Sequence, residues 1–292
     1  MSIALAYVGV ILIWSTTPLA IKWSAEDVSY LFGVTARMSL GAVCLLVLML
    51  LTRKPLPLHA KARRTYLAVA LHLYAGMLIT YWGARFIPSG WISVIYGLSP
   101  FMTALLAVTF LPENRLSLGK LFCYLLGACG LWLMFHSAMH LNQQAIQGMI
   151  AILIGAFLQS FSAIWIKRLK AELPALTQIS GGMLFSLPVY LLTWYSLEQG
   201  QWPETLSTQT QWSIIYLGLI ATPIGFALYF YVLTHLSAIT VALITLITPV
   251  FALFLGYRVN HEPLTLKILA GTSLILFALM LHALLDRRQR LN

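Results

Sequence analysis

Charged residues are scarce in this sequence. Asp, Glu, Lys and Arg make up 9% of the 292 residues, whereas 60% of the residues are apolar. A soluble domain usually contains about 25% charged residues, because its surface must be polar. The composition therefore excludes a soluble globular protein, and the high apolar content excludes a disordered chain.

Cysteines and catalytic motifs are also nearly missing. Cys44, Cys123 and Cys129 all lie inside apolar runs, so no disulfide framework is expected. The sequence has no His-Glu-x-x-His motif, no intramembrane aspartate pair, no Gly-x-Ser-Gly nucleophile and no Gly-rich nucleotide-binding loop. We therefore predict no catalytic residue, no metal site, no cofactor and no ATP-driven step.

Long apolar runs make up most of the chain. A membrane-spanning helix needs about 20 apolar residues, and ten such runs are separated by connectors rich in turn-forming or polar residues. The sequence thus predicts an all-α integral membrane protein with ten transmembrane helices, at roughly 3–21, 30–51, 65–86, 89–111, 117–135, 148–166, 175–197, 212–234, 237–256 and 265–285.

Basic residues are distributed unevenly among the connectors. A net charge of +10 would suggest nucleic acid in a soluble protein, but in membrane proteins Lys and Arg accumulate in cytoplasmic loops. With the N-terminus inside, the inner connectors hold Arg53, Lys54, Lys61, Arg63, Arg64, Arg115, Lys120, Lys167, Arg168, Lys170, Arg287, Arg288 and Arg290, and the outer side holds Lys22, Arg85, Arg258 and Lys267. This pattern predicts a multi-pass protein of a bacterial inner membrane, with both termini cytoplasmic and no nucleic-acid partner.

Two stretches of the chain look like copies of one unit. Matching residues recur 148 or 149 positions apart in the pairs Tyr81 and Tyr229, Ser89 and Ser237, Pro100 and Pro249, and Glu113 and Glu262. Ser15 and Lys22 match Ser160 and Lys167 at an offset of 145. Each half then holds five spans, and an odd number inverts the second half. Inverted repeats are typical of alternating-access transporters with a midplane site, and chance similarity among apolar segments is the alternative.

With these features the chain resembles the drug/metabolite transporter superfamily and, within it, the EamA-type family. The resemblance is carried by Trp14-Ser15-Thr16-Thr17-Pro18 with Lys22, by Arg37 in span 2, and by the Ser, Pro and Glu pattern that ends each half. It implies two inverted five-helix repeats, at 1–136 and 147–286, followed by a basic cytoplasmic tail at 287–292. It also implies export of small metabolites such as amino acids, or of drugs.

Polar residues inside the spans are the candidates for a substrate path, because such residues usually face the bundle interior or a cavity. Packing of Ser and Thr between helices is the alternative. We predict that a central cavity between the halves is bordered by Trp14, Thr17, Arg37, His72, Thr80, Tyr96, Ser99, Gln159, Thr245 and Thr248.

Arg37 and His72 have the most specific candidate roles. Arg37 lies roughly 9 Å inside the outer end of span 2, at 1.5 Å per residue. It can receive a substrate carboxylate or phosphate, or pack at the outer vestibule. His72 is the mid-span group with an ordinary pKa near neutral, so it is a candidate for substrate contact or proton coupling. A neutral histidine bonded to a neighbouring helix is the alternative.

The acidic residues are all predicted to lie at span ends or in connectors. A missing mid-span carboxylate counts against a cation antiporter that exchanges protons on a buried glutamate. Glu113 and Glu262 are predicted to cap the first turns of spans 5 and 10, where an acid meets the positive end of a helix. Trp91, near the start of span 4, is predicted to lie in an interfacial aromatic belt.

The sequence therefore favours a non-enzymatic carrier that exports small organic molecules by alternating access. A lipid flippase or a non-transporting membrane protein is the alternative, although a scaffold would need neither an inverted repeat nor polar midplane residues. The expected partners are a small-molecule substrate and membrane lipid, and a monomer is compatible with the sequence.

Overall fold

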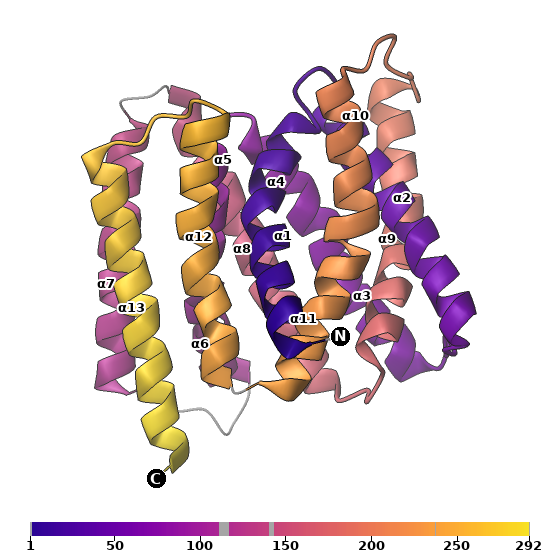
Figure 1. The fold of residues 1–292 in the computed structure, drawn as a ribbon. Helices are drawn as coiled ribbons and strands as arrows, with labels where there is room; N and C mark the ends of the chain where they lie inside the picture. Colours follow the sequence, from indigo (N-terminus) through magenta and orange to yellow (C-terminus); the bar gives the residue numbers. More distant parts are fainter. Residues whose placement is uncertain (1, 111–116, 140–142, 237, 292) are drawn as a thin grey trace.

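The computed structural model describes the chain except for residues 1, 111–116, 140–142, 237 and 292, and every regular element in the described part is a helix (Figure 1). The first half contains α1 (Ile3–Trp23), α2 (Tyr30–Thr52), α3 (Ala60–Leu71), η1 (His72–Gly76), α4 (Met77–Ala84), α5 (Ser89–Tyr96), α6 (Ser99–Phe110) and α7 (Leu118–Ala138). The second half contains α8 (Gln143–Leu169), α9 (Ala175–Glu198), α10 (Thr208–Ile215), η2 (Tyr216–Ala221), α11 (Pro223–His235), α12 (Ala238–Val259) and α13 (Leu266–Leu291).

These helices form ten spans. Nine stretches of the described chain are long and apolar enough to cross a membrane, and the shorter apolar stretch Leu243–Val259 in α12 supplies the tenth. The all-α, ten-helix prediction is confirmed, and the chain is a multi-pass membrane protein. Large apolar side chains on the outer faces are exposed, as expected where lipid is the solvent; they include Leu12, Leu50, Leu51, Phe122 and Trp132.

Polar side chains cap the first turns of several helices, and two of these helices, α3 and α10, begin before the predicted spans. Ser2, Ser29, Ser117 and Ser207 each accept a hydrogen bond from a backbone N–H of the helix that follows. His59 caps α3 in the same way, so this helix begins at Ala60, five residues before the predicted start. A hydrophobicity pattern misses such polar first turns.

Span 4 is divided in two, which the sequence pattern did not predict. Helix α5 ends at Tyr96 and α6 begins at Ser99. Pro100 has no backbone N–H to continue the helical ladder, and the Leu98 N–H instead donates to the Ile95 carbonyl at 3.0 Å. Pro249, the repeat-related residue, lies inside the continuous helix α12.

The two halves are interleaved rather than side by side (Figure 1). Helix α1 packs against α11 and α12 of the second half, and α8 packs in the same manner against the α3–η1–α4 span and α6 of the first half. Helix α2 contacts η2 and α9, while α9 contacts α3 and η1. Each of these contacts has a counterpart in the other half, and this pattern agrees with the predicted inverted repeat.

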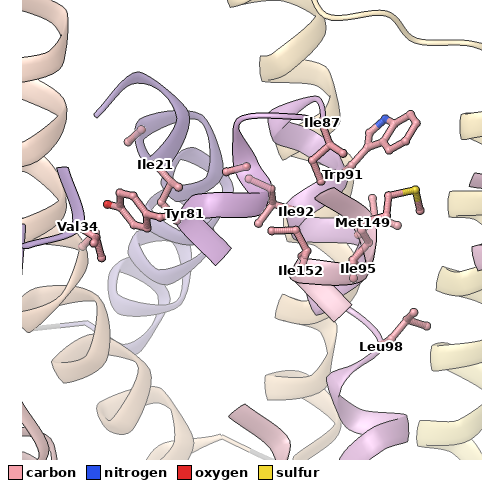
Figure 2. Close-up of a cluster of buried hydrophobic side chains, with 14 of the residues drawn as sticks. Ile21, Val34, Tyr81, Ile87, Trp91, Ile92, Ile95, Leu98, Met149 and Ile152 are labelled. Carbon is pink, nitrogen blue, oxygen red and sulfur yellow. The ribbon is translucent and has the colours of Figure 1, made fainter. Parts of the chain in front are cut away.

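The central core is built where α4 and α5 meet α8 (Figure 2). Ile92 and Ile95 of α5 are buried together with Met149 and Ile152 of α8. Trp91 belongs to this core and has 0% exposure, so its prediction as an interfacial residue was wrong. The start of α5 is covered by α12, which buries a tryptophan that the sequence places close to the end of a span.

Candidate functional site

Two π-helical segments interrupt corresponding spans of the two halves. Segment η1 lies in span 3 and begins at His72, and η2 lies in span 8 and begins at Tyr216. The Thr222 N–H donates to the Leu217 carbonyl five residues earlier, at 3.1 Å. π-Helical turns are rare in proteins overall, but many of those that occur lie at functional sites. The two segments therefore point to the middle of the bundle as a candidate functional region.

Arg37 lies beside η2 and is only 7% exposed. Its Nη2 donates a long hydrogen bond, 3.5 Å, to the hydroxyl of Thr222, whereas Nε and Nη1 are buried without any hydrogen-bond partner. The guanidinium carbon is 6.0 Å from the centroid of the Tyr81 ring. The predicted site residue is therefore a buried cation whose donors are mostly unused.

Aromatic and imidazole groups of both halves lie on the elements near this cation. Tyr81 of α4, Tyr190 of α9 and Tyr216 of η2 belong to elements that pack against α2, and the Tyr190 hydroxyl donates to the Leu73 carbonyl, next to His72. The Nδ1 atom of His72 is buried and has no hydrogen-bond partner. The structure thus brings Arg37, His72 and Tyr96 into one region, together with two tyrosines that were not predicted as site residues.

Thr80 and Tyr96 form a hydrogen-bonded pair between α4 and α5. Their hydroxyl oxygens are 2.7 Å apart, and Thr80 donates to the Gly76 carbonyl at 2.7 Å, so the Tyr96 hydroxyl donates to Thr80. The pair packs against Gly155 of α8, where an added Cβ would collide with the Thr80 hydroxyl oxygen and lie 3.0 Å from the Tyr96 hydroxyl. Close approach of α8 to this pair therefore requires glycine.

Tyr190 ties α9 of the second half to η1. Its hydroxyl donates to the Leu73 carbonyl at 2.7 Å and lies 3.1 Å from the Tyr74 carbonyl. The ring is fully buried. Tyr190 thus bonds to carbonyls of η1 across the boundary between the halves. The sequence did not single it out, because it is one of many aromatic residues in the spans.

The predicted residues of α1 have different roles. The Trp14 ring packs on Tyr229 of α11, with ring centroids 4.8 Å apart. The Thr17 hydroxyl donates to the Ile13 carbonyl of its own helix at 2.7 Å. Its neighbour Thr16, which was not predicted, instead lies 2.5 Å from the Tyr216 hydroxyl of η2.

The remaining predicted residues lie on α6, α8 and α12. Ser99 and Gln159 each contain a buried side-chain oxygen with no hydrogen-bond partner, and the Ser99 carbonyl accepts a hydrogen bond from Ser160 at 3.1 Å. In α12, Thr248 is buried and Thr245 is half-buried. Shared lining of one central cavity by the whole set stays a prediction.

Two pockets lie at the ends of the bundle rather than at this region. One is lined by the start of α2 and the end of α9 and includes Phe32, Glu198 and Trp202. The other lies beside Arg53 and Lys54 after α2. Neither pocket is lined by a residue of the predicted site.

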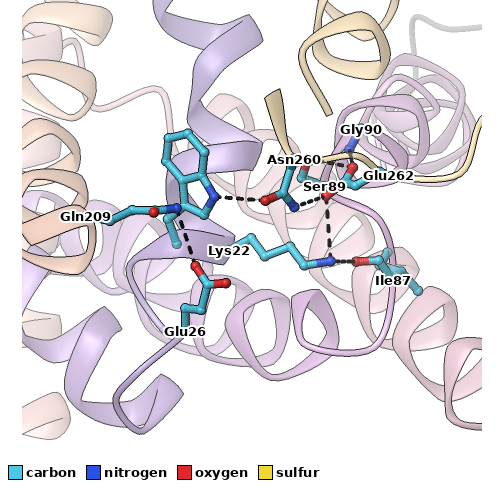
Figure 3. Close-up of polar contacts among 9 residues, drawn as sticks. Lys22, Glu26, Ile87, Ser89, Gly90, Gln209, Asn260 and Glu262 are labelled. Carbon is cyan, nitrogen blue, oxygen red and sulfur yellow. Dashed lines mark hydrogen bonds and ion pairs between the residues drawn. The ribbon is translucent and has the colours of Figure 1, made fainter. Parts of the chain in front are cut away.

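A second polar group joins the two halves where α1 ends and α5 begins (Figure 3). We call it the Glu262 cluster; it consists of Lys22, Trp23, Ile87, Ser89, Gly90, Asn260 and Glu262. The Glu262 carboxylate is 8% exposed, accepts hydrogen bonds from Ser89 Oγ at 2.9 Å and Asn260 Nδ2 at 2.8 Å, and lies 3.6 Å from Lys22 Nζ.

This geometry corrects the predicted role of Glu262. The carboxylate receives the Gly90 N–H at 3.4 Å and so caps the start of α5, in the other half. The first turn of α13 is served by Thr265, whose hydroxyl accepts the Ile268 N–H at 3.4 Å. A sequence shows that an acid precedes a helix, but it does not show that a different helix start lies closer. Glu113, the repeat-related residue, lies outside the described residues.

Lys22 and Asn260 complete the Glu262 cluster across the boundary between the halves. Lys22 Nζ donates to the Ile87 carbonyl at 2.9 Å, and Trp23 Nε1 donates to Asn260 Oδ1 at 3.0 Å. Every charge and amide in this group therefore has a partner, in contrast to Arg37. The Glu262 cluster therefore joins the halves through fully paired polar groups, whereas the guanidinium of Arg37 has donors that are not used.

Comparison with known proteins supports the interpretation of the fold. A solved structure titled "Crystal structure of protein" matches with a TM-score of 0.66 at 18% identity, covering 98% of this chain and 99% of that chain. This likeness concerns the fold alone.

Relatives in sequence carry transporter names. The uncharacterized transporter YoaV of Bacillus subtilis is 25% identical over 99% of both chains. An uncharacterized transporter of Archaeoglobus fulgidus is 24% identical over 91% of this chain and 93% of its own. Protein PagO of Salmonella typhimurium is 22% identical over 91% of this chain and 90% of its own.

The family model described as the EamA-like transporter family matches residues 1–136 and 146–284. The match covers both halves, including the spans that carry the two π-helices, Arg37 and the Glu262 cluster. The chain is a membrane transporter and belongs to the EamA-like transporter family.

Proposed function

We propose that this protein exports small organic metabolites across a bacterial inner membrane by alternating access around a site centred on Arg37. The observation that carries the proposal is the buried guanidinium of Arg37, which meets residues of both halves and keeps two donor atoms without partners. Buried polar groups are normally hydrogen-bonded. A group that stays unpaired between two halves is therefore a candidate for binding a transient ligand.

The Glu262 cluster supplies a gate for such a cycle. It joins the halves where α1 ends, the end predicted to face the outside. Alternating access requires the halves to move against each other around the midplane site. Export then proceeds by loading from the cytoplasm while the Glu262 cluster is intact, followed by its opening and release of the substrate.

The driving force is the substrate gradient or a proton carried by His72. In the described part of the chain, the acidic residues lie at helix ends or in connectors, such as Glu26, Glu198 and Glu262, and Asp286 of α13 follows the apolar span that ends at Leu285. His72 begins η1 and has a buried Nδ1 with no hydrogen-bond partner. It is the mid-span group whose ordinary titration range is close to neutral pH.

Transport by the purified full-length protein in proteoliposomes tests this proposal. Labelled amino acids, organic acids and lipophilic cations are measured in both directions, with and without a pH gradient. Movement of at least one compound supports a carrier of small molecules. Transfer of a labelled lipid between leaflets, with no movement of the soluble compounds, would support a flippase and overturn the proposal.

Labelling of single cysteines tests the orientation that export requires. A membrane-impermeant thiol reagent added to intact cells is expected to label a cysteine at Gln201 and to spare a cysteine at Lys61. Gln201 follows α9 and Lys61 lies in the first turn of α3, at the opposite end of the bundle. The reverse pattern would place the Glu262 cluster on the cytoplasmic side.

A further inference from the structure

The charge of Arg37 is not balanced within the described part of the protein. Its guanidinium forms no salt bridge with an acidic side chain there, and the salt bridge found is between Lys22 and Glu262. The partners of Arg37 are neutral: the Thr222 hydroxyl at 3.5 Å and the face of Tyr81 at 6.0 Å. Burying an unpaired charge is costly, so an arriving anion would gain much of its binding energy from this one group.

The free donors suit a planar anion with two oxygens. A guanidinium presents one edge with Nε and Nη2 and another with Nη1 and Nη2. In Arg37, Nε and Nη1 are unpaired and Nη2 carries only the long hydrogen bond to Thr222. Either edge can therefore hold both oxygens of a carboxylate, in the bidentate geometry that makes such pairs strong and directional.

The charge count distinguishes a carboxylate from a phosphate. Among the described residues, Arg37 is the basic side chain buried at mid-span, since Lys22 lies at the end of α1 and Lys167 near the end of α8. One guanidinium neutralises one negative charge. A phosphate monoester carries a charge of about −1.5 to −2 at neutral pH and would bring an unbalanced charge into the membrane interior.

The groups around Arg37 indicate the rest of the ligand. Tyr81 has its ring centroid 6.0 Å from the guanidinium carbon, and Tyr190 and Tyr216 lie on α9 and η2, which pack against α2. Aromatic rings bind flat apolar groups through their faces and edges. The described residues around Arg37 include no acidic side chain that would pair with a substrate ammonium group.

We propose that the substrates are small organic monocarboxylates, held by a two-point contact between the carboxylate and Arg37 and by tyrosine rings around the apolar part. This inference rests on the proposed carrier function and specifies the ligand of that same site. An amino group on the substrate is not required for binding.

Matched acids and amides test the inference on the purified full-length protein. Phenylacetate and phenylacetamide have nearly the same shape and differ in charge, and phenyl phosphate and phenethylamine provide a dianion and a cation. Binding is measured by thermal stabilisation in detergent, and transport by counterflow in proteoliposomes. We expect phenylacetate to bind at least about tenfold more tightly than phenylacetamide, because a charge-assisted pair replaces a neutral one.

Variants of Arg37 test whether this residue causes the preference for the acid over the amide. Arg37→Gln is expected to abolish the preference for the acid over the amide, and Arg37→Lys, which keeps the charge without the fork, is expected to retain part of it. Arg85→Gln is the matched control, because Arg85 is an exposed arginine whose guanidinium lies over Tyr30, 4.6 Å from the ring centroid. This control is expected to keep the full preference. If Arg37→Gln does not fold, Thr222→Val removes the hydroxyl next to the guanidinium and is expected to change the acid affinity several-fold with little effect on the amide.

The outcomes separate this inference from the carrier function. Equal binding of acid and amide, tighter binding of phenyl phosphate, or no binding of any acid at millimolar concentration would overturn the monocarboxylate inference. Transport of the amide or the amine alone would leave the carrier function standing and the inference refuted. Binding of phenylacetate without transport of any compound would support the site and count against the carrier.

Discussion

Glu262→Gln is the sharpest perturbation of the Glu262 cluster, because it keeps the size of the side chain and removes its charge. The bonds that cross between the halves come from Ser89 at 2.9 Å, Gly90 at 3.4 Å and Lys22 at 3.6 Å. The bond from Asn260 at 2.8 Å lies within one half and is retained when the halves separate. We therefore expect the substitution to favour the state in which this end of the bundle is open.

The size of the shift follows from these contacts. A hydrogen bond to a charged group contributes about 1.5–3 kcal/mol and a neutral one about 0.5–1.5 kcal/mol, so neutralising Glu262 weakens the Ser89 bond by about 1 kcal/mol. The longer Gly90 bond loses less, and the pair with Lys22, which is 29% exposed, contributes about 0–1 kcal/mol. The sum is about 2 kcal/mol, which corresponds to about a 30-fold increase in the open population.

The assay reports opening directly. Ser24 at the end of α1 has 0% exposure, so Ser24→Cys in a background without Cys44, Cys123 and Cys129 reacts with a membrane-impermeant maleimide only after opening. When opening is fast and rare, the labelling rate is proportional to the open population. We expect the rate to rise about 30-fold in Glu262→Gln.

The control for this experiment is Glu26→Gln at the same end of the bundle. Glu26 is exposed and accepts a single hydrogen bond, from Gln209 at 3.4 Å. Its neutralisation is expected to change the labelling rate less than twofold. Equal labelling of Glu262→Gln and the parent, with both proteins folded, would refute the idea that this cluster holds the halves closed.

Two further substitutions test the central region. His72→Gln keeps a polar side chain but cannot titrate near neutral pH. In proteoliposomes, any stimulation of transport by a pH gradient is therefore expected to disappear, while flux down the substrate gradient remains. Flux that is still driven by the pH gradient would exclude His72 as the coupling group. Gly155→Ala places a Cβ against the Thr80 hydroxyl and is expected to reduce transport at least about tenfold by separating Thr80 from Tyr96. Gly9→Ala, whose Cβ would meet only the end of the Leu228 side chain at 2.9 Å, is the matched control and is expected to transport normally.

The span pattern was predictable because it depends on composition. Apolar runs separated by Arg53-Lys54-Pro55, Pro88-Ser89-Gly90 and Asn260-His261-Glu262-Pro263 define helix ends wherever lipid excludes unpaired backbone groups. The π-helices were not predictable in this way, because η1 and η2 lie inside apolar runs that continue on both sides of them. Their hydrogen bonds depend on partners in other spans, such as Tyr190 for η1.

The candidate site was predictable in part, through residues whose chemistry is unusual inside a membrane. Arg37 and His72 stood out by charge and by titration range, and both lie in the region where the halves meet. Tyr190, Tyr216 and Thr222 did not stand out, because tyrosine and threonine are common in spans and their role depends on the helices they face. Glu262 was assigned to the wrong helix start for the same reason, since three-dimensional neighbours outweigh neighbours in sequence.

The interleaved halves have a consequence for how the protein is made. Thr222, the hydrogen-bond partner of Arg37, comes 185 positions later in the chain. At about 5–20 residues per second, synthesis of that stretch takes roughly 10–40 s. During this time α1 and α2 are in the membrane without α9, η2, α11 and α12, the elements they pack against. Until the second half is made, the guanidinium of Arg37 must therefore be solvated by lipid headgroups, water or the insertion machinery. If the first half is expressed alone, Arg37 stays exposed to lipid.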